Sequence, residues 1–161
     1  MNWSGSPDFQ KLAGWNPGEL EGNVSQEFHF ELPMQVRFRD IDAMGHVNNA
    51  VYFTYMEQAR IDYMRAIGSM SDSLDETWFI LAEELCQFKS PVPYGMPIVI
   101  QVRVSEMKDS SFVMEYRIVD RNTGCVMALG RTVNVAYDYP AGKSKPIPVE
   151  WRERIEAFER G

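Results

Sequence analysis

The segment from Ala50 to Ile67, AVYFTYMEQARIDYMRAI, decides the fold of this sequence. Its apolar residues recur every three or four positions, a spacing that places side chains on one face of an α-helix. That face comprises Tyr52, Tyr55, Met56, Ala59, Tyr63, Ala66 and Ile67. Asn48 or Asn49 can cap the start of the helix, and Gly68 can end it. A helix of this length spans about 27 Å, so it can lie across a whole sheet.

Strand patterns lie on both sides of this helix. The preceding segment, 28–38, alternates in polarity, and Pro33 within it indicates an edge strand or a bulge. Four further strands are predicted at 78–89, 97–107, 112–118 and 125–137, with Gly130 as a bulge in the last. Short turns require antiparallel neighbours, and a helix with one apolar face must bury that face on the sheet. We therefore predict an α+β fold, with a five-stranded antiparallel sheet wrapped around a long central helix and a short C-terminal helix near 149–158.

The chain divides into two parts by composition. Residues 1–27 are rich in Gly, Ser, Pro, Asn and acids and show no sustained period, so we predict a flexible N-terminal extension there. Residues 28–161 carry all of the predicted elements and form one predicted domain. With 161 residues, 45% of them hydrophobic, the chain is large enough to build one real core.

Charge and cysteine content narrow the class of protein. The net charge of -7 argues against binding to nucleic acid and to anionic membrane surfaces. No apolar stretch approaches the roughly 20 residues that cross a bilayer, and the N-terminus lacks a secretory pattern. Cys86 and Cys125 lie in strand-like runs without a metal-ligand spacing, so both are predicted to be buried, reduced thiols. We expect a soluble cytoplasmic protein.

The turn that enters the long helix carries unusual chemistry. Residues 39–49, RDIDAMGHVNN, bring two carboxylates, a histidine and two amides together. A helix N-terminus presents unpaired N–H groups that can stabilise an oxyanion. A carboxylate beside it can attack a carbonyl carbon or activate a water, and Gly45 allows the backbone to approach a ligand closely. These are the groups that acyl transfer requires.

The wider stretch from Val36 to Met64, VRFRDIDAMGHVNNAVYFTYMEQARIDYM, closely resembles the 4-hydroxybenzoyl-CoA thioesterase branch of the hotdog-fold thioesterases. The shared pattern is Asp-x-Asp-x-x-Gly-His-Val followed by Tyr and by Glu-x-x-Arg, which here are Asp40, Asp42, Gly45, His46, Val47, Tyr52, Glu57 and Arg60. The Pro91 to Gly95 turn also agrees, whereas Met96 replaces an acid that is frequent in the family. The resemblance implies a hotdog fold and hydrolysis of an acyl-CoA or acyl-carrier-protein thioester. It also implies no metal or redox cofactor, and a homodimer or homotetramer with sites between subunits.

Carried over by position, the resemblance makes Asp42 the catalytic carboxylate, as nucleophile or general base. Asn49 would polarise the thioester carbonyl through its main-chain N–H, and His46 would assist the carboxylate or the water. Asp40 would fix the loop. The further candidates for substrate binding are Gly45, Val47, Asn48, Tyr52 and Glu57.

Simpler roles compete with each assignment. Asp42 can cap its own turn, His46 can hydrogen-bond within the loop, and Asn48 and Asn49 can be helix caps. Tyr52 can belong to the core. The remaining alternatives are that Glu57 and Arg60 pair together or tie the helix to the sheet, and that Lys143 and Lys145 meet coenzyme A phosphates or simply lie in solvent.

Two other functions remain open from the sequence. A non-catalytic acyl-CoA-binding protein would keep the pocket but would not need Asp42. A hotdog dehydratase or hydratase would use a differently placed Asp/His or His/Glu pair. The acyl group is undetermined, and the acidic chain favours coenzyme A over an acidic carrier protein.

Overall fold

The computed structural model describes residues 27–70 and 78–161. The predicted extension at 1–27 lies outside these residues except for Glu27, so the extension and the proposed domain boundary remain predictions. Within the described residues, no helix is long and apolar enough to cross a membrane.

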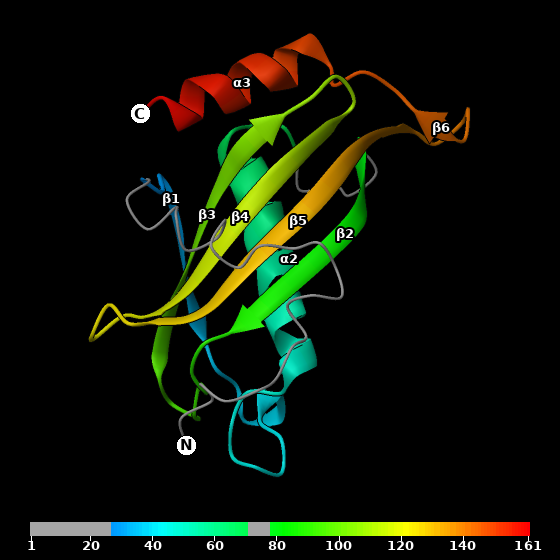
Figure 1. Ribbon diagram of the computed structural model, residues 1–161. Helices are drawn as coiled ribbons and strands as arrows, with labels where there is room; N and C mark the ends of the chain where they lie inside the picture. The colour runs from blue at the N-terminus through cyan, green and yellow to red at the C-terminus, as the bar shows by residue number, and fades with distance from the viewer. Residues whose placement is uncertain (1–26, 71–77) are drawn as a thin grey trace, which may run out of the picture.

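One antiparallel sheet forms the body of the molecule (Figure 1). Its strands lie in the order β1-β3-β4-β5-β2, with a short β6 paired to β5. The bounds are Phe30–Gln35 for β1, Phe79–Phe88 for β2, Pro97–Met107 for β3, Ser111–Asp120 for β4, Val126–Asp138 for β5 and Lys143–Ser144 for β6. The predicted α+β class and the five-stranded antiparallel path are therefore confirmed, and β6 is an addition. Pro33 lies in the edge strand β1, as Pro should.

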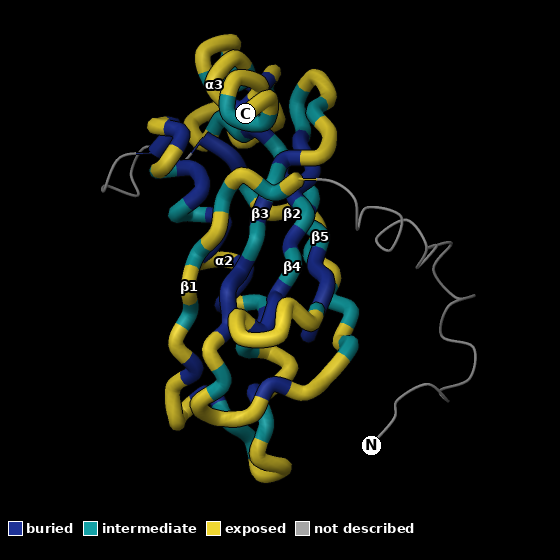
Figure 2. Tube along the Cα trace, turned by 90° about the vertical axis from the view of Figure 1, so that its left-hand side faces the viewer, coloured by how far each residue is buried: buried dark blue, intermediate teal, exposed yellow. Residues whose placement is uncertain are grey.

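Helix α2, Asn49–Ala66, lies against one face of the sheet (Figure 1). Its buried side chains include Tyr52, Tyr55, Met56, Ala59 and Tyr63, and they meet the inward residues of β3 and β4, such as Ile100 and Met114. Figure 2 shows the buried segments gathered where α2 meets the strands. The helix ends at Ala66, and Gly68 follows two residues later with a φ of 70°, which a residue with a side chain rarely adopts. This is the predicted hotdog architecture, in which the sheet wraps a central helix.

Gly130 has a different role from the predicted bulge. It pairs regularly with Cys86 and Tyr116, whereas the register shifts lie elsewhere, for example between Leu81 and Glu83 in β2. A Cβ at Gly130 would overlap the Met56 sulfur and lie 3.2 Å from the Tyr116 Cβ. The glycine is therefore needed so that α2 can approach β5 closely.

A second helix, α3, spans Val149–Glu159 and covers one end of the sheet and helix. The Tyr63 hydroxyl donates to Glu159 Oε1 at 2.5 Å, and the same oxygen accepts the Val104 N–H at 2.8 Å. Burial, followed by the nearby Glu159 charge, raises the pKa of Tyr63, so its hydroxyl stays protonated. These bonds hold α2, β3 and α3 together at the end away from the Asp42 turn.

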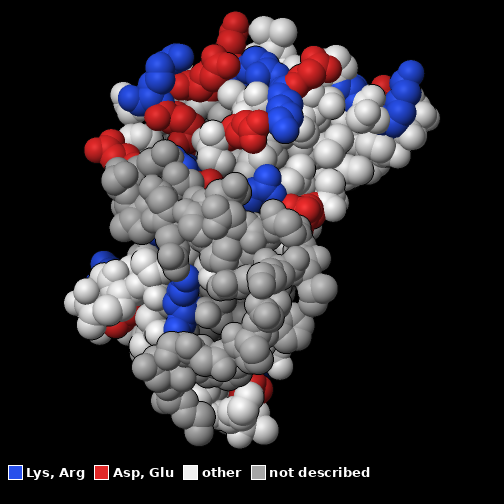
Figure 3. All heavy atoms as spheres, viewed as in Figure 1, with Lys and Arg blue, Asp and Glu red and all other residues white. Residues whose placement is uncertain are grey.

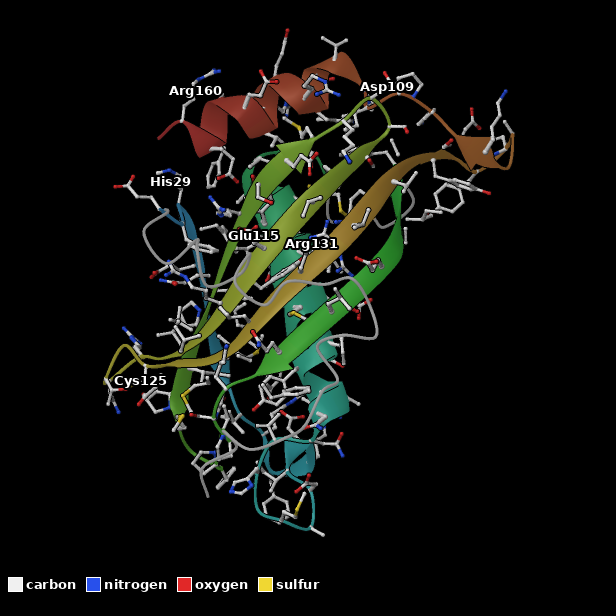
Figure 4. The ribbon with its side chains drawn as sticks, viewed as in Figure 1. His29, Asp109, Glu115, Cys125, Arg131 and Arg160 are labelled. Atoms are coloured by element: carbon white, nitrogen blue, oxygen red, sulfur yellow. The ribbon has the colours of Figure 1, made fainter. Side chains whose placement is uncertain are left out.

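Two side-chain predictions are resolved by the structure. Arg60 lies 3.6 Å from Glu84 of β2, so it ties the helix to the sheet and does not pair with Glu57. Cys125 was predicted to be buried, and this is wrong. It occupies the exposed tip of the β4–β5 turn, because β5 begins one residue later than expected (Figure 4). Cys86 is half-buried, and both thiols are free.

Candidate active site

The Asp42 turn is closed by its own backbone. The Asp42 N–H donates to the His46 carbonyl at 2.9 Å, and the Gly45 N–H donates to the Asp42 carbonyl at 3.0 Å. Gly45 has a φ of 82°, which a residue with a side chain rarely adopts. The sequence thus places Asp42 and His46 at the two ends of one tight turn.

The carboxylate of Asp42 is only partly used by this turn. Its Oδ1 accepts the Met44 N–H at 2.8 Å, which is the bond of an Asx turn. Within the described residues, no donor is recorded for Oδ2, and the side chain is half-buried. The capping role and a chemical role are therefore compatible, because one oxygen orients the group and the other stays available.

Asp40 fixes the loop, as the resemblance implied. Its carboxylate accepts from the Arg37 Nε and Nη2, both at 3.0 Å, and from the Tyr55 hydroxyl at 2.8 Å. Burial acts to raise the pKa of Asp40, but the hydrogen bonds from Arg37 and Tyr55 outweigh it and lower the pKa below its ordinary value. Arg37 precedes the short 3-10 helix η2, Phe38–Asp40. A charged carboxylate thus holds the segment that precedes Asp42.

The first turn of α2 separates the roles of Asn48 and Asn49. Asn48 is the N-cap, since its Oδ1 accepts the Ala50 N–H at 2.9 Å and its carbonyl accepts the Val51 N–H at 2.9 Å. Asn49 is the first helical residue and is exposed. Its own N–H has no recorded acceptor among the described residues. This leaves one main-chain donor, at the positive end of the helix dipole, open to a ligand.

The connection between β2 and β3 forms the other wall of the turn. The Val47 N–H donates to the Val92 carbonyl at 2.8 Å, and His46 forms a β-bridge with Pro93. Val47 is itself buried in the core and is bridged to Ile41. The sequence indicated the Pro91 to Gly95 turn only as a family feature. Its main-chain contact with the Asp42 turn could not be read from side-chain patterns.

Two more predicted residues lie farther along α2. Tyr52 is buried, and its ring packs edge-on against Phe88 of β2 at 5.0 Å between centroids. Burial raises the pKa of Tyr52 to about 12, so the residue is a neutral wall rather than an acid–base group. Glu57 is exposed on α2, and its charge, after burial, contributes to the raised pKa of Glu84. Glu57 therefore lies close enough to Glu84 of β2 for their charges to interact, and its part in substrate binding stays a prediction.

The described residues provide one partly free carboxylate, Asp42, and one open main-chain N–H, Asn49, within the same short segment. Within the described residues, no group of three or more His, Cys, Asp and Glu side chains has the arrangement of a metal site. Arg37, Tyr55 and Val92 are functional neighbours that sequence reasoning missed. The spacing of Arg37 and Asp40 was a usable signal, but the other two contacts are long-range.

The family model for the thioesterase-like superfamily matches residues 36–155. The chain belongs to the thioesterase-like superfamily. The match begins directly after β1 and ends within α3, and it includes the Asp42 turn. This member is thus a hotdog-fold thioester hydrolase.

Relatives of this thioesterase-like chain agree with the assignment. The acyl-CoA thioesterase YbgC of Haemophilus influenzae is 30% identical over 121 residues, which are 73% of this chain and 86% of the relative. A Thermus thermophilus thioesterase, solved with coenzyme A and Zn, is 36% identical with a TM-score of 0.75, over 83% of this chain and 96% of that one. The gentisyl-coenzyme A thioesterase BH1999 is 29% identical with a TM-score of 0.69, over 79% and 99% of the two chains.

Proposed function

We propose that this thioesterase hydrolyses an acyl-coenzyme A thioester with Asp42 as the catalytic carboxylate. The observation that carries the proposal is that one short segment holds both the partly free Asp42 carboxylate and the open Asn49 N–H at the start of α2. Solved relatives bind coenzyme A or are named for coenzyme A thioesters. The net charge of -7 also favours coenzyme A over an acidic carrier protein.

Two routes use the same residues. As a nucleophile, the Asp42 oxygen bonds to the thioester carbon, the C–S bond breaks, and the thiolate takes a proton and leaves as the thiol. Water then cleaves the resulting anhydride and returns the carboxylate. As a general base, Asp42 takes a proton from a water whose oxygen bonds to the same carbon, and the thiol leaves in one sequence. In both routes the Asn49 N–H stabilises the carbonyl oxygen while it carries negative charge.

His46 has a supporting role in this proposal. It ends the turn that Asp42 begins, so both residues lie just before the start of α2. Gly45 shapes the turn, and Asn48 caps the helix. Tyr52 packs its buried ring against Phe88 of β2. We propose no metal or redox cofactor. Turnover should therefore survive exhaustive dialysis against a chelator, and loss of activity that Zn²⁺ restores would overturn this part of the proposal.

Assembly of two copies along β2 is the second part of the proposal. Strand β2 is an end strand of the sheet, and it exposes Leu81, Leu85 and Phe88. Exposed apolar edge strands pair with other strands. Phe88 contacts Tyr52, which lies three residues after the start of α2. A second copy paired along β2 would therefore adjoin the site, and the homodimer or homotetramer would carry its sites between subunits.

The state of the two cysteines bears on the cellular compartment of the enzyme. Both cysteines are free, which suits a reducing environment, and we propose a cytoplasmic enzyme.

The test measures release of free thiol from a panel of acyl-CoA thioesters by wild type, Asp42→Asn and His46→Ala. We expect Asp42→Asn to lower kcat by about a hundredfold or more with acyl-CoA binding intact, and His46→Ala to cost less. Asp62→Asn, on the outer part of α2, is the matched control and should keep full activity. The competing function is a non-catalytic acyl-CoA-binding protein. Equal binding by wild type and Asp42→Asn, with no turnover of any thioester, would replace the enzyme with that function.

A further inference from the structure

We propose that a surface hollow beside the Asp42 turn binds the adenosine phosphate end of coenzyme A, with Tyr94 stacking on the base and Arg121 holding a phosphate. This inference rests on the proposed function, because it assigns a binding site to the nucleotide end of the same coenzyme A substrate. It names a subsite apart from the groups that act on the thioester.

The hollow adjoins the turn through the β2–β3 connection. It has a volume of about 420 Å³ and lies between the end of β1, the start of β3 and the turn after β4. Residues lining it include Met34, Tyr94, Gly95, Met96, Ile98 and Arg121. Pro93, which bridges to His46, directly precedes Tyr94 in the chain. A ligand that extends from Asp42 along this connection therefore reaches the hollow.

Tyr94, which lines the hollow, contacts a second exposed aromatic ring, that of Phe38. Tyr94 is 61% exposed and Phe38 is 81% exposed. Their rings meet edge to face, with centroids 6.0 Å apart and planes at 86°. Phe38 thus supports the Tyr94 ring while leaving a face of it available. Exposed aromatic faces of this kind are suited to stacking with nucleobases, which is tolerant of base identity.

The charge at the hollow favours an anion. Arg121 lies in the β4–β5 turn, and its N–H donates to the Pro97 carbonyl at 2.9 Å, which holds the turn at the hollow. In the described part of the chain, its guanidinium has no recorded ion-pair partner. The neighbouring Asp120 is already used, accepting from the Asn122 N–H and the Thr123 hydroxyl. No acidic residue lines the hollow in a chain with a net charge of -7. An arginine in this setting suits a phosphate.

Other occupants and other cations fit less well. An acyl chain favours an enclosed apolar pocket, whereas this hollow is open to solvent and carries Arg121 and Gln35. Lys143 and Lys145 lie at and beside β6, at the far end of the molecule from the Asp42 turn (Figure 1). Charged side chains of both signs also crowd that end, around α3 (Figure 3). Within one chain, these lysines are too far along β5 to serve the same ligand.

The first test measures binding of adenosine 3′,5′-bisphosphate by calorimetry. Wild type should bind it, and Arg121→Gln should bind about tenfold more weakly, since one charged hydrogen bond is at stake. Tyr94→Ala should also weaken binding by about tenfold, while Lys143→Gln should match wild type. Thermal melts confirm that each variant folds. No binding by wild type, or equal binding by wild type and Arg121→Gln, overturns the subsite.

The second test separates this inference from the proposed function. The same acyl group is offered on coenzyme A and on pantetheine, which lacks the nucleotide. Arg121→Gln should raise KM for the coenzyme A thioester by about tenfold with little change in kcat, and should leave the pantetheine thioester unaffected. Equal losses on both substrates overturn the subsite while hydrolysis stands. If no thioester is cleaved, the hydrolase proposal fails and the calorimetry still decides the subsite. An effect on acyl-chain preference instead would assign the hollow to the acyl group.

Discussion

The Tyr55 hydroxyl donates a hydrogen bond of 2.8 Å to the buried carboxylate of Asp40, which joins the second turn of α2 to the loop that carries Asp42. Arg37 binds the same carboxylate from the other side. Among the described residues, the hydrogen bonds recorded for Asp42 are all within its own turn. Its position therefore depends on a neighbour two residues earlier, and that neighbour offers a direct way to test the design of the turn.

Asp40→Asn should destabilise the fold and disturb the site together. The amide cannot accept from Arg37 and Tyr55 as the carboxylate does, so we expect a loss of about 2 kcal/mol in the free energy of unfolding, measured in urea. Turnover should fall even where the variant remains folded. Asp62→Asn is the control, because its partners lie on the surface of α2. Equal stability of wild type and Asp40→Asn would show that the clamp contributes nothing.

The same clamp predicts a pH dependence. The pKa of Asp40 is lower in the folded chain than its ordinary value of 3.8. Its stabilising contribution is therefore complete above that ordinary value and is lost as the pH falls through the lower folded pKa. The difference in unfolding free energy between wild type and Asp40→Asn should be largest near neutral pH and should shrink in strong acid. A difference that grows on acidification would contradict the charged clamp.

Asn49→Pro tests the oxyanion donor without removing the helix. Proline is favoured at the first helical position and lacks only the N–H, and Asn48, with a ψ of 138°, already has the conformation that precedes proline. We expect kcat to fall by about a hundredfold or more, while the free energy of unfolding stays unchanged. Asn49→Ala keeps the N–H and should keep most of the activity. If the alanine variant is the inactive one, the side chain rather than the main chain is the working group.

Gly130→Ala tests the close approach of α2 and β5. The new methyl group would overlap the Met56 sulfur, and both positions are fully enclosed. We expect a cost of about 1–3 kcal/mol in chemical unfolding. Met56→Ala should also destabilise alone, but the double variant should be more stable than the sum of the two losses predicts. Strict additivity would mean that the two residues do not compete for space.

Lysine substitutions along β2 test the proposed pairing of subunits. Leu81→Lys combined with Leu85→Lys places charges on an exposed edge, which opposes strand pairing. We expect light scattering to show a dimer or larger assembly for wild type and a monomer for the variant, with turnover lost in parallel. Val149→Lys, an exposed apolar residue on α3, should leave the mass unchanged. A wild-type monomer with full activity would remove the interface from the mechanism.

The fold was predictable because apolar residues recur at regular spacings along its helices and strands. Strand β3 begins and ends where its alternation begins and ends, at Pro97 and Met107, and α2 differs from its prediction by one residue at each end. Gly130 was misassigned because a missing side chain can mean either a bulge or a close neighbour. Only the packing of Met56 distinguishes the two, and Met56 is distant in sequence.

The segment that holds the candidate site could be located from the sequence, but the contacts that build it could not. The carboxylate, the cap and the helix start all lie within one short segment, so their chemistry could be read together. The contacts of Tyr55 with Asp40 and of Val92 with Val47 join separate segments. A main-chain hydrogen bond does not depend on the type of residue, so it cannot be predicted from the sequence. The Tyr94 hollow depends on such bonds. These parts required the three-dimensional arrangement.

The hydrogen bond between Val47 and Val92 also bears on when the active site forms during synthesis and folding. During synthesis, the Asp42 turn leaves the ribosome well before the β2–β3 connection, so a partly made chain has the carboxylate without its wall. Pairings between distant segments form late because the closed loop loses entropy first. Hydrolytic activity should accordingly appear on refolding only after Val47 and Val92 have paired. Unfinished chains would then pose no threat to the thioester pool of the cell.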